Sequence, residues 1–243
     1  MDYLSSGSRF QGATRPLAAN LKTGSQRFAI IGGQDMIQIC TDFDGTITTR
    51  DTIVYVTEKF GAGEEYRAMI VEKIKSGEIS VFKGISLELE TVKVSWEKAV
   101  EHLRKEVFID RGFEEFVNWS RERGYPMTIL SSGMTPVVEL YTAHFGIPIF
   151  AHKLEVTPEG WRFEVIEEHR KRTVLEEMAE KGPIVYIGDG TSDLEAIPYA
   201  SLLFARKGKY LEAHCRANGI PCRSFSDFLA VKENLGAWDG SRH

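Results

Sequence analysis

Residues 38–48 read Gln38-Ile39-Cys40-Thr41-Asp42-Phe43-Asp44-Gly45-Thr46-Ile47-Thr48, a short apolar segment followed by acids and a glycine. The pattern predicts a strand that ends at Asp42 and then turns, which places Asp42 and Asp44 at the C-terminal tip of that strand. In an open parallel α/β sheet this edge binds ligands, because loops and helix N-termini meet there. An Asx-type turn that merely closes the strand is the alternative interpretation.

Composition limits the class of function. The 243 residues suffice for one α/β domain with an insertion or for two small domains. A net charge of -5 argues against a nucleic-acid-binding surface and favours small-molecule chemistry. No apolar run approaches the roughly 20 residues that span a bilayer.

The three cysteines are Cys40, Cys215 and Cys222, and none of them forms a C-x-x-C pair. An odd number without that spacing suggests neither a disulfide framework nor a thiolate zinc site. We therefore expect reduced thiols in a cytoplasmic protein.

The first 35 residues differ from the rest of the chain. They mix Ser, Gly, Asn, Arg and Pro without a sustained period, and they lack the pattern of a signal peptide. We expect residues 1–35 to be a disordered extension that contributes nothing to the fold, with Met36 as an alternative start.

A helical region follows the first strand. Apolar residues recur at helical spacing in four successive segments, 51–60, 64–75, 80–92 and 95–105. The next strand begins only near Met127, so these helices predict a small inserted bundle over residues 53–109 instead of a βαβ alternation.

A second strand tip follows residue 110. We expect Asp110 to cap a helix that runs to Arg123, and residues 126–130 to form a buried strand that stops at Ser131-Ser132-Gly133. A helix begins at Pro136, so this tip offers a hydroxyl and free backbone N–H groups. An ordinary helix N-cap is the alternative.

Two further strand ends carry charged residues. A predicted helix begins near Arg170-Lys171-Arg172, where either a neighbouring anion or Glu167 and Glu168 offset the three cations. The apolar strand 183–187 ends in Gly188-Asp189-Gly190, and Asp193 falls in the first turn of the next helix. Clustered carboxylate oxygens of this kind suit Mg²⁺.

Together these elements predict an α/β fold. Its core is a Rossmann-like parallel sheet formed by residues 36–52 and 110–235, with the helical bundle inserted at 53–109 and a tail at 236–243.

The ordered set of D-x-D-G-T, a strand ending in Ser131, Lys171 at a helix start and G-D-G-x-x-D resembles the four motifs of the haloacid dehalogenase superfamily. The resemblance covers about residues 36–235. Phosphatases of that superfamily have an acid at the position of Asp44, whereas dehalogenases lack it. The insertion between the first two motifs is similar to a C1-type cap, which closes over small substrates.

The resemblance implies a role for each motif residue. Asp42 would attack phosphorus to give an aspartyl-phosphate, and Asp44 would act as general acid and then as general base. Mg²⁺ would be held by Asp42, the backbone carbonyl of Asp44 and Asp189. Lys171 would add positive charge, and Asp193 would orient Lys171 or a metal-bound water. Substrate-binding positions implied by the motifs are Ser131, Ser132 and Thr46.

The resemblance also implies a small phosphorylated metabolite as substrate, for a monomer or homodimer without a nucleic-acid or membrane partner. Details such as Leu203-Phe204-Ala205-Arg206-Lys207 look like the MtnX-like branch, related to phosphoserine phosphatase, which includes 2-hydroxy-3-keto-5-methylthiopentenyl-1-phosphate phosphatase of methionine salvage. Ser132 departs from the Ser-Gly-Gly common in relatives.

Several alternatives remain open at this point. Phosphoserine phosphatase, with Asp51 and Arg67 holding the amino-acid end, is the first, and another small-metabolite phosphatase is the second. A non-catalytic module that binds phosphate or Mg²⁺ and a receiver domain are others, although receiver domains have no counterpart of Asp44.

Overall fold

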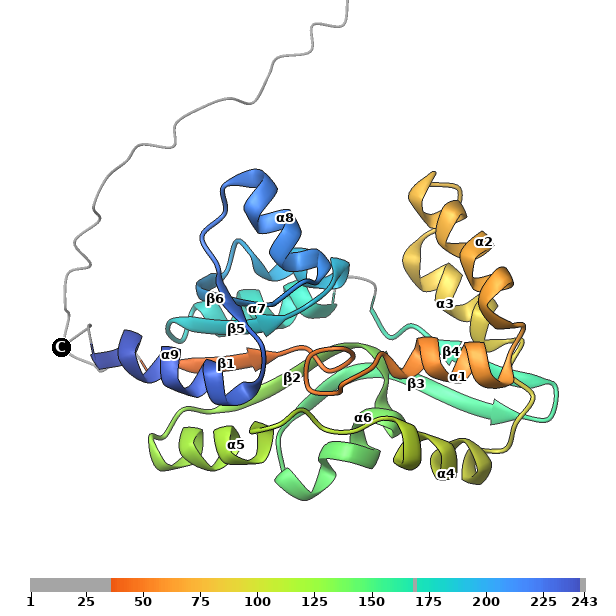
Figure 1. Ribbon diagram of the computed structural model, residues 1–243, viewed down its shortest axis with the longest axis horizontal. Coiled ribbons are helices and arrows are strands. Elements are labelled where there is room, and N and C mark those ends of the chain that lie inside the picture. The colour runs from red at the N-terminus through yellow and green to blue at the C-terminus, as the bar shows by residue number, and fades with distance from the viewer. Residues whose placement is uncertain (1–35, 168–169, 241–243) are drawn as a thin grey trace, which may run out of the picture. The chain divides into compact units, whose positions relative to one another are not determined.

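The computed structural model describes residues 36–167 and 170–240 of the chain. The strands in this part are β1 (Gln38–Thr41), β2 (Met127–Met134), β3 (Ile149–Thr157), β4 (Gly160–Glu164), β5 (Ile184–Gly188), β6 (Ala200–Arg206) and β7 (Arg223–Phe225). They form one sheet in the order β4-β3-β2-β1-β5-β6-β7 (Figure 1). Neighbouring strands run parallel except for β4, which is antiparallel to β3. The predicted α/β fold is confirmed.

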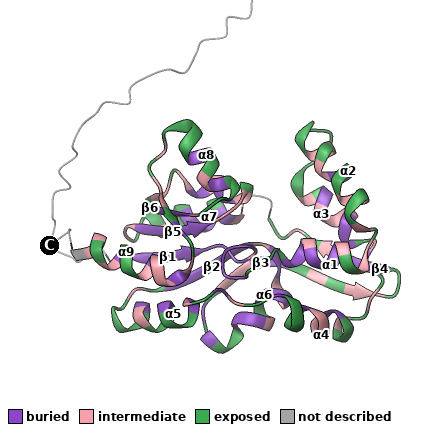
Figure 2. Cartoon of the chain, viewed as in Figure 1, coloured by how far each residue is buried: buried purple, intermediate pink, exposed green. Residues whose placement is uncertain are grey.

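Strand β1 occupies the middle of the sheet. Ile39 pairs with Met127 of β2 on one side and with Val185 of β5 on the other. Successive side chains of a strand point to opposite faces, so Ile39 enters one apolar cluster and Cys40 enters the other. Burial on both faces explains the nearly continuous apolar sequence of the central strands, whose ribbons are mostly coloured as buried in Figure 2.

Helices cover both faces of the sheet. The cluster around Ile39 includes side chains of α5 (Phe113–Glu122), α6 (Thr135–Thr142) and α9 (Phe228–Gly240). The cluster around Cys40 includes side chains of α7 (Arg170–Ala179) and α8 (Tyr210–Asn218). Two 3-10 turns, η1 (Ala143–Phe145) and η2 (Thr191–Ala196), complete the connections. This layering leaves the C-terminal edge of the strands free for a site.

The helical insert lies between β1 and α5. It consists of α1 (Thr52–Phe60), α2 (Gly63–Lys75), α3 (Val81–Leu89) and α4 (Trp96–Glu106). Asp51, Ser80 and Ser95 start α1, α3 and α4 by accepting backbone N–H groups with their side chains. The insert also contacts the sheet, since α3 packs on β4 and the Trp161 indole donates to the Val94 carbonyl at 2.9 Å.

Two local expectations were wrong. Strand β2 does not stop before Ser131 but continues to Met134, because a register shift after Leu130 lets Met134 pair with His152 of β3. Asp110 does not cap α5, which begins after Gly112 at φ 84°. The Asp110 carboxylate instead accepts hydrogen bonds from the Phe228 amide and from Arg206, so Asp110 joins α9 to β6.

The C-terminal part of the chain differs from expectation in one respect. Helix α9 continues to Gly240, so residues 236–240 are helical and not a tail, with Leu235 and Trp238 packed on the core. The expected extension 1–35 and residues 241–243 lie outside the described residues. No helix within the described part is long and apolar enough to cross a membrane.

Candidate active site

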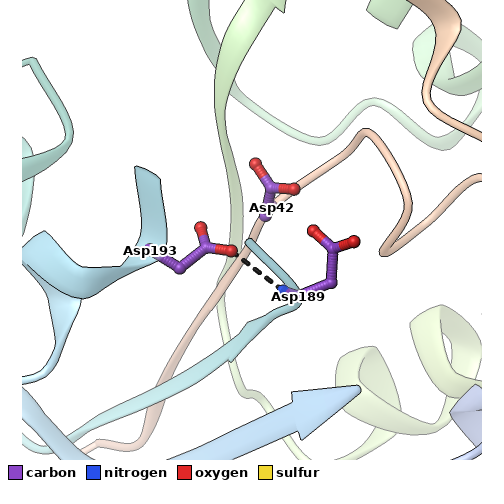
Figure 3. Close-up of side chains that lie close together, drawn as sticks. All are labelled: Asp42, Asp189 and Asp193. Atoms are coloured by element: carbon purple, nitrogen blue, oxygen red, sulfur yellow. Dashed lines mark hydrogen bonds between the residues drawn. The ribbon is translucent and has the colours of Figure 1, made fainter. Parts of the chain in front are cut away.

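Three carboxylates meet at the C-terminal edge of the sheet. Asp42 follows β1, Asp189 follows β5, and Asp193 lies in η2. One carboxylate oxygen from each lies within 4.8 Å of the other two (Figure 3). The backbone N–H groups of Asp189 and Gly190 both donate to Asp193 Oδ2 at 2.9 Å, which fixes that carboxylate in place.

Lys171 supplies the positive charge inside this group. Its Nζ lies 2.7 Å from Asp42 Oδ1, 2.7 Å from Asp193 Oδ1 and 3.1 Å from Ser192 Oγ. The side chain is 6% exposed. Burial alone would lower the pKa of Lys171, but the charges of Asp193 and Asp42 outweigh that effect and raise it. Lys171 is therefore held as a cation between two acids.

Asp44 is held by a different partner, Thr52. Its Oδ1 accepts from the backbone N–H of Thr52 at 2.7 Å and from the Thr52 hydroxyl at 2.6 Å. Burial, followed by the charge of Asp51, raises the pKa of Asp44 to about 7, while the Thr52 hydrogen bonds oppose the rise. Asp44 is thus poised to exchange a proton near neutral pH.

Two glycines make room for these acids. A Cβ on Gly45 would lie 2.4 Å from Asp189 Oδ2, and a Cβ on Gly133 would lie 2.6 Å from Asp44 Oδ2. Gly45 also has φ 73°, a conformation that residues with a side chain rarely adopt. The D-G-T turn therefore needs glycine for two independent reasons.

The remaining predicted residues lie at different places. Ser131 and Ser132 line a cavity of about 230 Å³ together with Lys171. Ser131 Oγ accepts from the Gly133 amide at 2.9 Å. The Thr46 side chain is completely buried and its hydroxyl has no hydrogen-bond partner within the described part of the chain. Its backbone carbonyl accepts from Arg206 Nη2 at 2.6 Å.

A family model for haloacid dehalogenase-like hydrolases matches residues 39–198, a span that contains Asp42, Ser131, Lys171 and Asp189. The chain belongs to this family. The hydrolase is 32% identical over 216 residues to Pdp3-interacting factor 1 of Schizosaccharomyces pombe, an alignment that covers 82% of this chain and 94% of the relative.

Named phosphatases are among the other relatives. Polyol phosphate phosphatase PYP1 of Saccharomyces cerevisiae is 28% identical, with 81% of this chain and 91% of the relative covered. The 2-hydroxy-3-keto-5-methylthiopentenyl-1-phosphate phosphatase of Bacillus mycoides is 29% identical, with 82% and 97% covered. The hydrolase is a phosphatase of this family, as the sequence predicted.

The fold is also that of a solved phosphatase. A phosphoserine phosphatase carrying an analogue of the phospho-aspartyl intermediate superposes with a TM-score of 0.65 at 22% identity. The superposition covers 83% of this chain and 99% of that one. At this identity the likeness concerns the fold alone.

Sequence reasoning missed several residues that hold the site together. Thr52 orients Asp44, and the Tyr186 hydroxyl donates to Asp193 Oδ1 at 2.6 Å. Arg206 bridges the Thr46 carbonyl and Asp110, with Nη2 2.7 Å from Asp110 Oδ2. Each of these contacts joins residues that belong to no common motif. Of these residues only Thr52 has a signal in the sequence, its place at the start of a predicted helix, and that signal does not identify Asp44 as its partner.

Proposed function

We propose that this hydrolase cleaves small phosphomonoesters through an aspartyl-phosphate at Asp42. The observation that carries the proposal is the position of Asp42, which is 5% exposed at the tip of the central strand with one carboxylate oxygen on Lys171. An oxygen of Asp42 forms the new bond to phosphorus as the bond from phosphorus to the alcohol oxygen breaks, and the electron pair of that bond leaves with the alcohol oxygen.

Asp44 carries the proton in this scheme. It donates to the departing alcohol oxygen, and it later takes a proton from the water that attacks phosphorus and releases Asp42. Asp44 is bonded to Thr52 and Asp42 to Lys171, and these different partners support different steps for the two acids.

We propose that four further residues help to bind the phosphoryl group, namely Lys171, Ser131, Ser132 and Thr46. The ammonium of Lys171 places positive charge beside the oxygens that become negative in the transition state. Ser131 and Ser132 line the same cavity as Lys171, which supports a direct contact with the phosphoryl oxygens. The buried Thr46 would act through its place in the turn, and Asp193 would hold Lys171 in position.

The acids fit a magnesium ion. Asp42, Asp189 and Asp193 offer hard oxygen ligands within one small space, and Lys171 is the cation that bonds to two of them. Burial, followed by the charge of Asp193, raises the pKa of Asp189 to about 7, although Lys209, whose Nζ lies 3.9 Å from Asp189 Oδ2, opposes the rise. We assign the ion to Asp42, Asp189 and the Asp44 carbonyl. When bound, Mg²⁺ supplies charge that offsets the repulsion between Asp42 and the phosphate.

We further propose that the insert, residues 53–109, is a cap that covers the substrate. Val81 and Phe82 of α3 line the same cavity as Ser131 and Lys171. A substrate whose phosphate lies at the acids therefore also contacts the insert.

Two substrates follow from the relatives. The first is 2-hydroxy-3-keto-5-methylthiopentenyl-1-phosphate, on which the Bacillus relatives act by name. The second is a polyol phosphate, because a relative of similar identity carries that name. We expect the reaction to take place in the cytoplasm and the enzyme to be a monomer or homodimer.

The test is phosphate release with Mg²⁺ from both candidate substrates, phosphoserine, phenyl phosphate and glycerol 3-phosphate. We expect one compound to be preferred and Asp42→Asn to lose at least about a hundredfold in kcat without losing the fold. The Lys98→Met variant, which removes an exposed ion pair with Glu101 on α4, serves as the control. Residual turnover near the wild-type rate in Asp42→Asn would refute the nucleophile.

A further inference from the structure

The 230 Å³ cavity extends beyond the phosphate site. Ser131 and Lys171 mark its phosphate end, and Lys171 is bonded directly to Asp42. Its other walls come from α3, β3, η2 and the start of α7. We use the name alcohol pocket for the part of the cavity that is lined by Val81, Phe82, Phe150, His152, Arg170 and Glu195.

His152 is the residue of the alcohol pocket whose chemistry is best defined. It is 2% exposed, and its Nδ1 accepts the backbone N–H of Ile166 at 3.2 Å. An imidazole nitrogen that accepts a hydrogen bond carries no proton, so the neutral ring has its proton on Nε2. His152 therefore lines the pocket as a neutral ring whose one N–H group is at Nε2.

The surroundings keep the ring neutral and fixed. Burial, followed by the charges of Arg170 and Lys171, lowers the pKa of His152 to about 4. Phe82 contacts the ring in a T-shaped arrangement at 4.9 Å between centroids, and Phe163 does so at 5.4 Å. Since Phe82 belongs to the insert and His152 to the sheet, this contact joins the two parts at the pocket wall.

We propose that His152 is a specificity-determining residue whose Nε2–H donates a hydrogen bond to an oxygen on the alcohol part of the substrate. The inference rests on the proposed phosphatase function and names the substrate class. That class is a phosphomonoester of an uncharged alcohol that carries an acceptor oxygen, a hydroxyl or a carbonyl, beside a small apolar part.

The rest of the pocket agrees with this class. Val81, Phe82 and Phe150 form an apolar wall against which carbon atoms pack favourably. The Arg170 guanidinium lies over the Phe150 ring at 5.2 Å, so the pocket holds a fixed positive charge. That charge and the Lys171 ammonium disfavour a substrate with its own ammonium group, although Glu195 offsets part of the repulsion.

The test compares selectivity between two substrates. One substrate is 2-hydroxy-3-keto-5-methylthiopentenyl-1-phosphate or a polyol phosphate, whichever is cleaved faster. The other is phenyl phosphate, whose alcohol part has no acceptor besides the ester oxygen. We expect His152→Phe to lower the ratio of their kcat/KM values about tenfold, mainly through KM, because one hydrogen bond is lost. His152→Asn keeps a donor and an acceptor and should hold the ratio within about threefold.

His144→Phe is the matched control, because His144 is exposed on η1 and does not line the pocket. An unchanged ratio in His152→Phe would overturn the proposal, and so would an equal fall for both substrates. If that variant does not fold, wild-type enzyme is tested with analogues that lack each alcohol oxygen in turn. Losses below about twofold for every analogue would overturn the proposal equally. Failure of the phosphatase function itself would appear as no phosphate release from any compound.

Discussion

Asp42 and Asp44 are two positions apart and have different partners. Asp42 Oδ1 bonds to Lys171, whereas Asp44 Oδ1 bonds to Thr52. Their presence at a strand tip could be predicted, because an apolar run followed by Asp-Gly-Thr ends a strand. The hydrogen bonds from Thr52 to Asp44 and from Tyr186 to Asp193 could not be predicted, since they depend on how the turn and η2 fold in three dimensions.

Gly45→Ala should impair activity more than its effect on stability accounts for. The new Cβ meets Asp189 Oδ2 at 2.4 Å and so displaces a proposed metal ligand. Gly124→Ala is the control, because Gly124 has a similar φ of 69° and open space around its Cβ. Both variants should lose about 1 kcal/mol of unfolding free energy, and only Gly45→Ala should lose most of its kcat/KM. Equal activities would argue against the account.

His152 predicts an acid-sensitive stability. Its pKa is lowered to about 4 in the folded protein by burial and by Arg170 and Lys171, so the unfolded chain binds the proton more tightly. Stability is lost as the pH falls below the unfolded pKa of about 6.5, and the loss continues to the folded value.

Urea unfolding of wild type and His152→Asn measures this effect. Between about pH 7.5 and about pH 5, wild type should lose about 2 kcal/mol more unfolding free energy than the variant. Parallel pH profiles for the two proteins would show that His152 is not held neutral.

At the scale of elements, β2 shows where prediction from sequence ends. Ser131-Ser132-Gly133 has the composition of a turn, yet these residues continue the strand to Met134, where it pairs with His152. Composition reports local preference, whereas the pairing depends on β3, a segment that follows α6 in the chain. The helices of the insert, by contrast, could be predicted from their spacing and capping residues.

Arg206 links three segments of the chain near the D-G-T turn that follows β1. Its guanidinium donates to the Thr46 carbonyl, to Asp110 and to the Ser226 carbonyl. Asp110 is 7% exposed and its amide donates to the Ile47 carbonyl at 2.7 Å. Removing the guanidinium leaves Asp110 buried without its cation, which is costly in a low-dielectric interior.

Arg206→Met should therefore lower the unfolding free energy by about 3 kcal/mol. Lys98→Met, which breaks an ion pair with Glu101 whose members are both exposed, should cost less than about 0.5 kcal/mol. Urea unfolding compares the two variants. Similar losses in both would mean that the Arg206 contacts do not stabilise the fold.

At the scale of the whole molecule, the sheet gathers charge from distant parts of the chain. Asp42, Lys171, Asp189 and Asp193 meet because parallel strands end at a common edge. This meeting is why the family could be predicted from four short motifs. The alcohol pocket could not, because it forms between the insert and the sheet, and neither sequence alone indicates the contact between Phe82 and His152.

Excess negative charge at that edge predicts that Mg²⁺ stabilises the folded protein. At a concentration about 100 times its Kd, the ion should add about 2.7 kcal/mol to the unfolding free energy. Asp189→Asn should lose most of this gain, whereas Glu101→Gln, at an exposed ion pair of α4, should keep it. Thermal unfolding with Mg²⁺ and with excess chelator measures the difference. A full response in Asp189→Asn would place the ion elsewhere.

The central claim is that Asp42 accepts the phosphoryl group. The most direct test is rapid acid quenching during turnover of the preferred substrate, followed by peptide mass spectrometry. The account predicts a phosphoryl group on Asp42 in wild type and none in Asp42→Asn. Turnover without any adduct on Asp42, or an adduct on another residue, would contradict it.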